Sequence, residues 1–267
     1  IKENKLMAKY GIFSWFGFVM PLSERLELIK KAGFDSTCLW WEDEEGAYPV
    51  KKTDMPKMVR DFGLSLDNIH TPFCNSNDLW SESLSARSEI VKQYLGWLED
   101  CARFDIPIMV MHIMEGDILP ELSSNGIESM SYLVIKAEEL RVKIAVENTK
   151  FADGVDFILS EIESEYLGLC YDSSHGRLHG CEFLLKDFGR RLITCHISDN
   201  DGEMDRHWLP GNGIIDWKEF CESFPKKHYL GNLMLEVYPT GDEIKGGPAE
   251  FLNKAFKSIS ALGSFSS

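Results

Sequence analysis

Short apolar runs alternate with amphipathic segments along the whole chain. The apolar runs predict β-strands, because they are only a few residues long and several are rich in β-branched and aromatic side chains. Eight such strands are predicted, at residues 10–19, 36–41, 64–69, 107–111, 143–146, 167–171, 192–195 and 233–235. The amphipathic segments predict eight helices, at residues 23–31, 53–62, 81–104, 126–142, 153–164, 183–191, 217–224 and 248–262. In the longest of these, apolar residues recur at helical spacing and form one face: Ile90, Tyr94, Trp97, Leu98 and Cys101.

This alternation predicts the fold. Strands separated by helices pair in parallel through crossover connections. Eight units without a break in composition predict one α/β domain over residues 1–267, closed as a (β/α)₈ TIM barrel. Residues 1–6, which precede Met7, are interpreted as an extension or a disordered N-terminus. An open doubly wound sheet is the alternative, but no G-x-G-x-x-G sequence opens a helix after a strand.

Composition and charge narrow the classes of partner. The net charge of −15 is opposite in sign to the clustered Lys and Arg that bind a phosphate backbone, so nucleic acid is not expected as a partner. No apolar run of about 20 residues predicts a membrane span. The seven cysteines include no C-x-x-C pair, which suits a reducing compartment. Since no charged-then-apolar leader opens the sequence, we expect a cytoplasmic location.

Six consecutive predicted strands, the third to the eighth, lead into a side chain that can bind a metal. These side chains are His70, His112, Glu147, Asp172, His196 and Glu236. In a barrel, the carboxyl ends of the strands meet at one rim, where active sites are built. Each residue alone has an ordinary explanation, such as a hydrogen-bonded core histidine or an acid near a helix start. Together they predict a divalent metal centre, because imidazole nitrogen and carboxylate oxygen are its usual ligands.

The polar stretch after the seventh strand, residues 195–217, carries further candidates. Its sequence is CHISDNDGEMDRHWLPGNGIIDW. We assign His196 to the core site, and Asp205 and His207 to a second pair that the loop carries back over the rim. The other acids are interpreted as solvated or as supporting the ligands through hydrogen bonds: Asp199, Asp201 and Glu203. A solvated acidic loop with two incidental histidines is the alternative.

These residues resemble the xylose isomerase-like barrel superfamily, which includes metal-dependent sugar isomerases and epimerases and apurinic endonucleases of the endonuclease IV type. The resemblance spans nearly the whole chain. It rests on NIHTP at 68–72, VMH at 110–112, AVENT at 145–149, CYDSSH at 170–175, CHISDN at 195–200, DRH at 205–207, LPGNGIIDW at 209–217 and LEVYP at 235–239.

The resemblance implies a core metal site at Glu147, Asp172, His196 and Glu236. It also implies that Glu147 and Glu236 face the substrate and exchange its proton. The endonuclease branch uses a trinuclear zinc set, and its further ligands would fall on His70, His112, His175, Asp205 and His207. The sequence has a match for every one of them.

Three departures favour the isomerase branch over the nuclease branch. The segment TPFCNSNDLW after His70 lacks the Tyr-led loop of the nucleases, the sixth strand leads into DSSH in place of DTCH, and the segment after His196 lacks their longer insert. Basic residues are also sparse in the rim loops. We therefore expect a metal-dependent isomerase or epimerase of a sugar or sugar phosphate. A zinc-dependent apurinic endonuclease-type phosphodiesterase is the alternative, and a sugar-binding protein without turnover is a third class.

The isomerase hypothesis specifies the chemistry at the rim. A divalent ion, Mn²⁺ or Zn²⁺ with Mg²⁺ or Co²⁺ also open, would stabilise an enediolate while two carboxylates move the proton. His175 is expected to contact the substrate or a metal. Trp15 and Trp41, with Phe16 and Trp40, are expected to form an apolar wall for the sugar, although packing in the core would explain them equally well. Homo-oligomerisation through the helices of the barrel is left open.

Overall fold

Eight parallel strands form one sheet in the computed structural model, which describes residues 9–264. From β1 to β7 each strand pairs with the next one in sequence, and β8 pairs with β1. The strands are β1 (Tyr10–Phe13), β2 (Ser36–Trp40), β3 (Ser65–His70), β4 (Ile108–Met111), β5 (Lys143–Glu147), β6 (Leu167–Asp172), β7 (Leu192–His196) and β8 (Leu233–Leu235). Residues 1–6, predicted to be an extension, lie outside the described range.

The ring of strands is nearly closed. Between β7 and β8, Ile197 bridges the remaining gap: its N–H donates to the carbonyl of Met234 at 2.8 Å, and its carbonyl accepts from the N–H of Glu236 at 3.2 Å. The predicted (β/α)₈ barrel is therefore confirmed.

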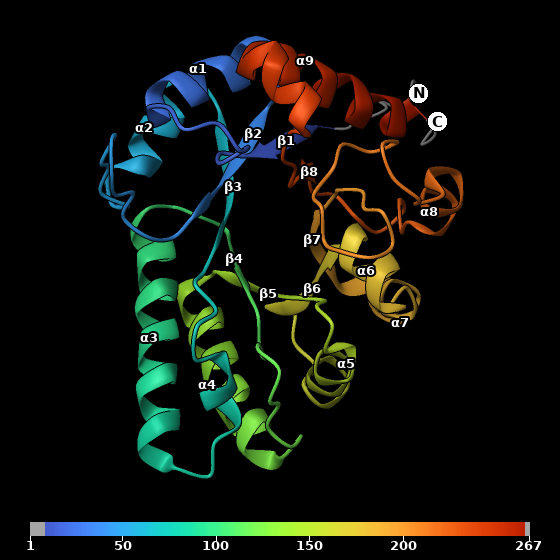
Figure 1. The fold of residues 1–267 in the computed structure, drawn as a ribbon. Helices are drawn as coiled ribbons and strands as arrows, with labels where there is room; N and C mark the ends of the chain where they lie inside the picture. The colour runs from blue at the N-terminus through green and yellow to red at the C-terminus, as the bar shows by residue number, and fades with distance from the viewer. Residues whose placement is uncertain (1–8, 265–267) are drawn as a thin grey trace, which may run out of the picture.

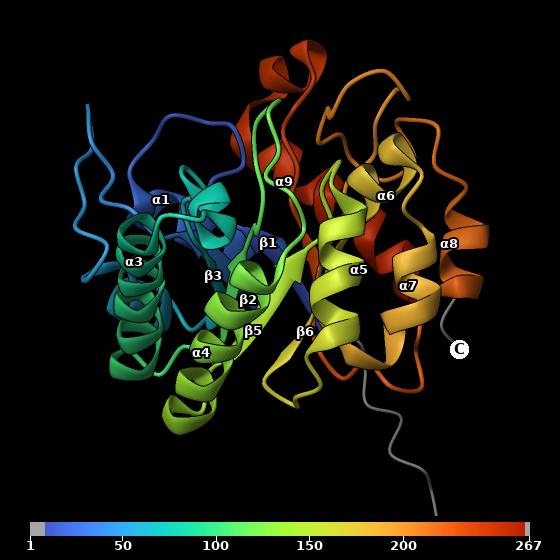
Figure 2. The ribbon, with the colours of Figure 1, turned by 90° about the horizontal axis from the view of Figure 1, so that it is seen from below.

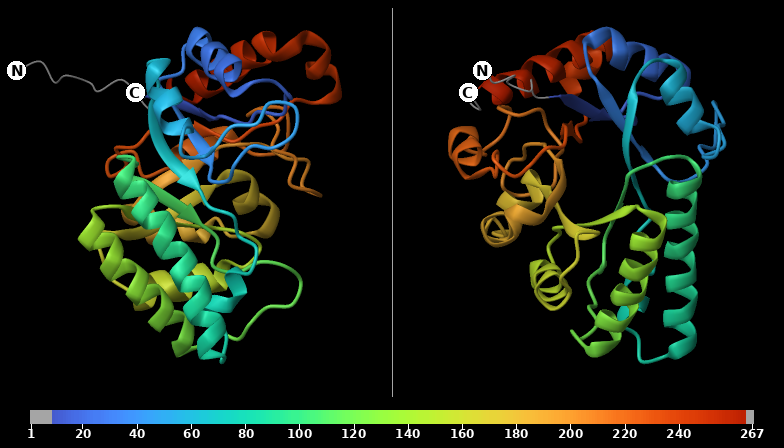
Figure 3. Two further views of the ribbon diagram at one scale, coloured as in Figure 1. Left: turned by 90° about the vertical axis from the view of Figure 1, so that its left-hand side faces the viewer. Right: turned by 180° about the vertical axis from the view of Figure 1, so that it is seen from behind.

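Helices surround the strands on the outside, as the views from the front and from behind show (Figures 1 and 3). They are α1 (Leu22–Ala32), α2 (Met55–Asp61), α3 (Leu84–Arg103), α4 (Ser124–Leu140), α5 (Ala152–Glu161), α6 (Ser173–His179), α7 (Phe183–Phe188), α8 (Trp217–Ser223) and α9 (Gly241–Ser264), with 3₁₀ helices η1 (Ser76–Trp80) and η2 (Gly189–Arg191). None of the helices described here combines the length and apolarity needed to cross a bilayer.

Three elements differ from the sequence prediction. The first strand ends at Phe13 rather than at residue 19. A short helix, α6, begins directly after β6, because the Asp172 side chain caps it by accepting from the N–H of His175 at 2.7 Å. The last helix begins at Gly241, before the predicted start, and is interrupted at Gly247, whose φ of 78° is readily adopted only by glycine.

The alternation of side chains along the strands places the candidate ligands at the rim of the barrel. In β5, Ile144 and Val146 belong to the main core, while Ala145 packs in a separate small cluster with Val110 and Cys170. Side chains two positions apart share a face of a strand. The residue two positions beyond each member of the small cluster is a candidate ligand: His112, Glu147 and Asp172. The small cluster therefore forms a floor beneath the site. Figure 2 shows the barrel from the side, with the loops that follow the strands gathered at one end.

Candidate active site

Four side chains, three of them buried and Glu236 partly buried, converge at the carboxyl ends of the last four strands. Their ligand atoms all lie within 4.8 Å of one another: Glu147 from β5, Asp172 from β6, His196 from β7 and Glu236, which follows β8. His196 Nδ1 lies 3.1 Å from Glu147 Oε1 and 3.0 Å from Glu236 Oε2. The structure thus brings together the four residues predicted as the core metal site.

One oxygen in this group has no partner among the described residues. Asp172 Oδ2 is buried without a hydrogen bond, although Asp172 Oδ1 accepts from the N–H of His175. A buried, unpaired carboxylate oxygen is costly. Its position among two further carboxylates and an imidazole is one that a cation would satisfy. Three carboxylates and one histidine suit a divalent ion such as Mn²⁺ or Zn²⁺, so the donor set fits the predicted cofactor.

The pKa values of the group also favour a bound cation. Burial would raise the pKa of Glu147, but His196, His112 and His70 hold it well below its usual range. Burial likewise opposes the ionisation of Glu236, yet His196 brings its pKa to about 2. His196 in turn has a pKa well above its usual value, because its interactions with Cys170, Glu147 and Glu236 outweigh its burial. The imidazolium proton thus supplies positive charge to the carboxylates, and a divalent ion would displace it.

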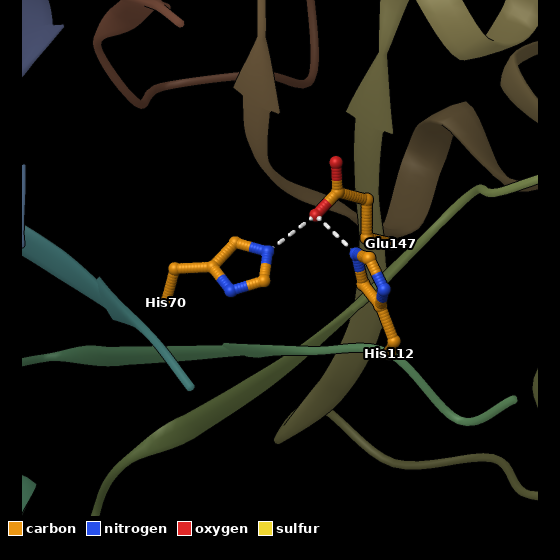
Figure 4. Close-up of side chains that lie close together, drawn as sticks. All are labelled: His70, His112 and Glu147. Carbon is orange, nitrogen blue, oxygen red and sulfur yellow. Dashed lines mark hydrogen bonds and ion pairs between the residues drawn. The ribbon is translucent and has the colours of Figure 1, made fainter. Parts of the chain in front are cut away.

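A second group, formed by His70, His112 and Glu147, adjoins the first (Figure 4). Glu147 Oε2 lies 2.9 Å from His70 Nε2 and 3.3 Å from His112 Nε2. His70 Nδ1 donates to the carbonyl of Thr71 at 2.9 Å, which leaves Nε2 as the nitrogen that faces the carboxylate. Anchoring of the other ring nitrogen is typical of a metal-binding histidine.

Aromatic rings hold the two imidazoles of this second group in place. Trp40 stacks on His70, with ring centroids 5.2 Å apart and planes 20° apart. Phe73 stacks on His112, with centroids 4.5 Å apart and planes 10° apart. Each imidazole is therefore fixed by stacking as well as by a hydrogen bond.

A third group lies beside α6, where Asp205 Oδ2 joins two more histidines. It is 3.0 Å from His175 Nε2 and 2.9 Å from His207 Nε2. Here too, each Nδ1 faces a main-chain carbonyl: His175 Nδ1 donates to Asn148 at 2.9 Å and His207 Nδ1 to Glu236 at 3.1 Å. Burial alone would lower the pKa of His207, but its bond to Asp205 raises it to about 9. All nine predicted ligands therefore belong to one continuous site.

The site opens into a cavity of about 950 Å³. Ligands from all three groups line it, including His70, Glu147 and Asp205. Aromatic side chains also line the cavity: Trp15, Trp40, Tyr48, Phe73 and Tyr238. The cavity is large enough for a small-molecule ligand.

The model of one protein family, described as the xylose isomerase-like TIM barrel, matches residues 26–255. The chain belongs to this family.

Relatives of this xylose isomerase-like barrel were found among known proteins and solved structures. An uncharacterized protein of Methanocaldococcus jannaschii is 27% identical over 266 residues, which cover 91% of this chain and 89% of the relative. The crystal structure of a D-tagatose 3-epimerase-like protein is 24% identical with a TM-score of 0.71, over 95% of this chain and 98% of that one. The structure of an IolI protein with a bound zinc atom is 20% identical with a TM-score of 0.76, over 96% and 98%. At these identities the two structures establish the shared fold.

One acid of this xylose isomerase-like barrel has a different role from the one predicted. Asp199 is fully buried, so the first of its two interpretations, as a solvated acid, is wrong. Its carboxylate accepts from the N–H groups of Gly211 and Ile215 at 2.9 and 3.2 Å, and from the indole N–H of Trp217 at 2.9 Å. Asp199 therefore ties together the two ends of the loop that carries Asp205 and His207. Neither the cavity nor the three ligand groups include it.

A second prediction is also wrong. Trp41 does not form a wall of the site, because it is fully buried in the main core and its indole N–H donates to Asp100 Oδ2 at 2.9 Å. Phe16 lies in the same core. Trp15 and Trp40 do line the cavity. Adjacent residues of an extended chain point to opposite faces, which separates Trp40 from Trp41.

Several cavity residues were not predicted from the sequence. They include Tyr48, Phe73, Glu115, Lys150 and Tyr238. Glu115 supports the second group, since its Oε2 lies 3.0 Å from His112 Nδ1. Its position three residues after His112 was a usable signal, as was that of Tyr238 two residues after Glu236. Tyr48 lies in a loop whose return over the cavity no local pattern indicated.

Proposed function

We propose that this chain is a divalent-metal-dependent isomerase or epimerase that moves a proton next to the carbonyl group of a sugar. The observation that carries the proposal is the pair Glu147 and Glu236, two carboxylates from the ends of β5 and β8 that both contact His196 and both line the cavity. The name of the D-tagatose 3-epimerase-like structure, which shares this fold, supports the same class of chemistry.

The proposed mechanism gives each residue a separate task. A divalent ion held by Glu147, Asp172, His196 and Glu236 would supply positive charge that makes a C–H beside the carbonyl more acidic. The pKa values of Glu147 and Glu236 lie below their usual range. Both are therefore ionised at neutral pH, as a general base must be. One would take the proton and the other return it. His175, which lines the cavity, would donate to a substrate oxygen.

The test compares two variants for solvent deuterium incorporation into ketohexoses in D₂O. Glu236→Gln is expected to lower exchange at least a hundredfold, because an amide cannot take the proton. The matched control is Glu203→Gln, an exposed residue in the loop after β7, which should retain wild-type exchange. Equal exchange by wild type and Glu236→Gln would remove Glu236 from the mechanism. Lack of exchange by the wild type with every ketose and aldose would contradict the function itself.

One observation favours a second function, a zinc-dependent phosphodiesterase of the apurinic endonuclease type. All nine ligands that this activity would use are gathered in the three groups, each with a carboxylate joining histidines. Against it, Lys150 is the one Lys or Arg among the described residues that line the cavity. Three zinc ions per chain by metal analysis, with cleavage of abasic-site DNA, would establish the phosphodiesterase. A single ion without cleavage supports the isomerase.

A further inference from the structure

TIM barrels that bind phosphorylated substrates commonly hold the phosphate at one place, formed by the loops after the seventh and eighth strands and the N-terminus of a nearby helix. Backbone N–H groups and the helix dipole attract the anion there. This chain has the same parts: a loop with two glycines, residues 209–217, lies after β7, and five residues separate the end of β8 from the start of α9.

Several N–H donors of the loop after β7 are already used. The buried Asp199 carboxylate accepts from Gly211, Ile215 and Trp217, and the N–H of Ile214 donates to the carbonyl of Asn200 at 2.9 Å. A Cβ on Gly213 would lie 2.1 Å from the Asn200 oxygen, which shows how closely this loop packs on itself. A carboxylate of the chain thus occupies the position in which this loop would receive an anion.

A carboxylate of the chain also caps the start of α9. Glu243 Oε2 accepts from the N–H of Thr240 at 2.9 Å, and the Thr240 hydroxyl oxygen accepts from the N–H of Glu243 at 3.4 Å. This reciprocal arrangement is a capping box. Glu243 Oε1 also accepts from Asn212 Nδ2 at 3.2 Å, which links the helix to the loop after β7. A second carboxylate of the chain therefore lies at the helix end that could bind phosphate.

Lysine and arginine side chains offer a phosphate little in the cavity. Lys150, its one lining Lys or Arg among the described residues, places Nζ 3.1 Å from Asp117 Oδ1. Arg25 is fully buried and donates to the carbonyl of Ser14 and to Glu44. The rim itself carries further acids: Glu42, Asp43, Glu45 and Glu115. Phosphate recognition in proteins depends on unpaired Arg or Lys, or on free N–H groups.

We infer that the substrate of this site is an unphosphorylated, uncharged sugar. The inference rests on the proposed isomerase function and specifies its substrate class. Asp199 and Glu243 accept from N–H donors of the two segments that bind phosphate in a barrel of this class, and the acidic rim would repel a phosphate dianion.

The first test uses pairs of ketohexoses and their 6-phosphates, with D-fructose and D-fructose 6-phosphate as the leading pair. Deuterium incorporation in D₂O by the manganese-loaded protein should show kcat/KM at least tenfold higher for the free sugars. Equal or faster exchange of the phosphates would overturn the inference and leave the isomerase standing. Lack of exchange from both classes would contradict the isomerase instead.

In that case, saturation-transfer NMR of the same pairs with the magnesium-loaded protein would test the inference by binding. Stronger binding of the free sugar supports the inference, and stronger binding of the phosphate overturns it.

The second test changes the charge at the start of α9. Glu243→Gln keeps an acceptor for the Thr240 N–H but removes the negative charge. We expect the ratio of kcat/KM for the 6-phosphate to that for the free sugar to rise at least threefold, with the free sugar unaffected. The control, Glu139→Gln, removes an exposed charge on α4 and should leave the ratio unchanged. An unchanged ratio in Glu243→Gln would show that Glu243 does not exclude phosphate.

Discussion

At the scale of the residue, two carboxylates join five of the histidines of the site. Glu147 contacts His70 and His112 through one oxygen and His196 through the other. Asp205 contacts His175 and His207 through a single oxygen. The carboxylate of Glu147 is therefore shared between the core group and the second group, and its loss should affect both.

Glu147→Gln is expected to destabilise the metal-free protein at neutral pH by about 3 kcal/mol, because it leaves buried imidazoles without their charged partner. Urea unfolding measures the change in the free energy of unfolding. The control is Glu128→Gln, on a side chain that is 75% exposed, which should change stability by less than about 0.5 kcal/mol. Equal stabilities for the two variants would mean that Glu147 is not the common partner.

Metal affinity should depend on pH in a way set by Asp172 and His196. Burial raises the pKa of Asp172 to about 6, so this carboxylate gains a proton as the pH falls below 6. His196, whose pKa is raised well above its usual value, must already lose a proton to bind a metal at neutral pH. Each displaced proton lowers the affinity about tenfold per pH unit. Titration with Mn²⁺ between pH 5 and 8 should therefore show affinity rising with pH, with a steeper slope below pH 6; a constant slope would contradict the assignment of Asp172.

The residue types at the strand ends could be predicted from the sequence, because each follows a recognisable apolar run and matches a metal ligand. The roles of Trp41 and Asp199 could not. The sequence does not indicate which of two adjacent tryptophans faces the cavity. Nor does it distinguish a buried, hydrogen-bonded carboxylate from a solvated one. Both depend on contacts with residues distant in the chain, Asp100 for Trp41 and the far end of the loop for Asp199.

At the scale of the element, the loop after β7 determines the position of the third ligand group. Asp199 holds its two ends together. Across the loop, the N–H of Asp199 donates to the carbonyl of Trp208 at 2.8 Å, and the N–H of Trp208 donates to the carbonyl of Asp199 at 2.9 Å. Its tip carries Asp205 and His207. The core group is supplied by the strands themselves, so the loop and the core group should respond separately to mutation.

Asp199→Asn is expected to loosen this loop, because an amide cannot accept the same set of hydrogen bonds from Gly211, Ile215 and Trp217. Hydrogen–deuterium exchange of residues 200–216 should become at least tenfold faster, while one divalent ion still binds to the core group. Glu203→Gln, an exposed change in the same loop, is the control and should exchange like the wild type. Unaltered exchange in Asp199→Asn, or loss of the core ion, would refute this separation.

The elements that the sequence missed are short and lack periodicity. The seven-residue helix α6 begins directly after a predicted ligand, because Asp172 both ends β6 and caps the helix. No apolar stripe marks such a helix, so the residues DSSH indicated only a ligand motif. The longer elements were predicted well, since Tyr94, Leu98 and Cys101 of α3 are buried along one face as their spacing requires.

At the scale of the whole molecule, the barrel brings the ends of consecutive strands together at a single site. The eight strand–helix units predicted closure, and closure brings the ends of β3 to β8 to one rim. The number of units could be counted in the sequence, but the final closure through Ile197 could not, because it depends on pairing between residues 197 and 235. Pairing of barrels through their helices stays a prediction, as does the cytoplasmic location.

The central claim, that three ligand groups at one rim form a metal-dependent site for proton transfer, is tested most directly by metal removal and return. The chelated protein should incorporate no deuterium from D₂O into a panel of free ketohexoses, and stoichiometric Mn²⁺ or Zn²⁺ should restore incorporation at the carbon next to the carbonyl. Exchange that persists in the fully chelated protein, or that no divalent ion produces, would contradict the account.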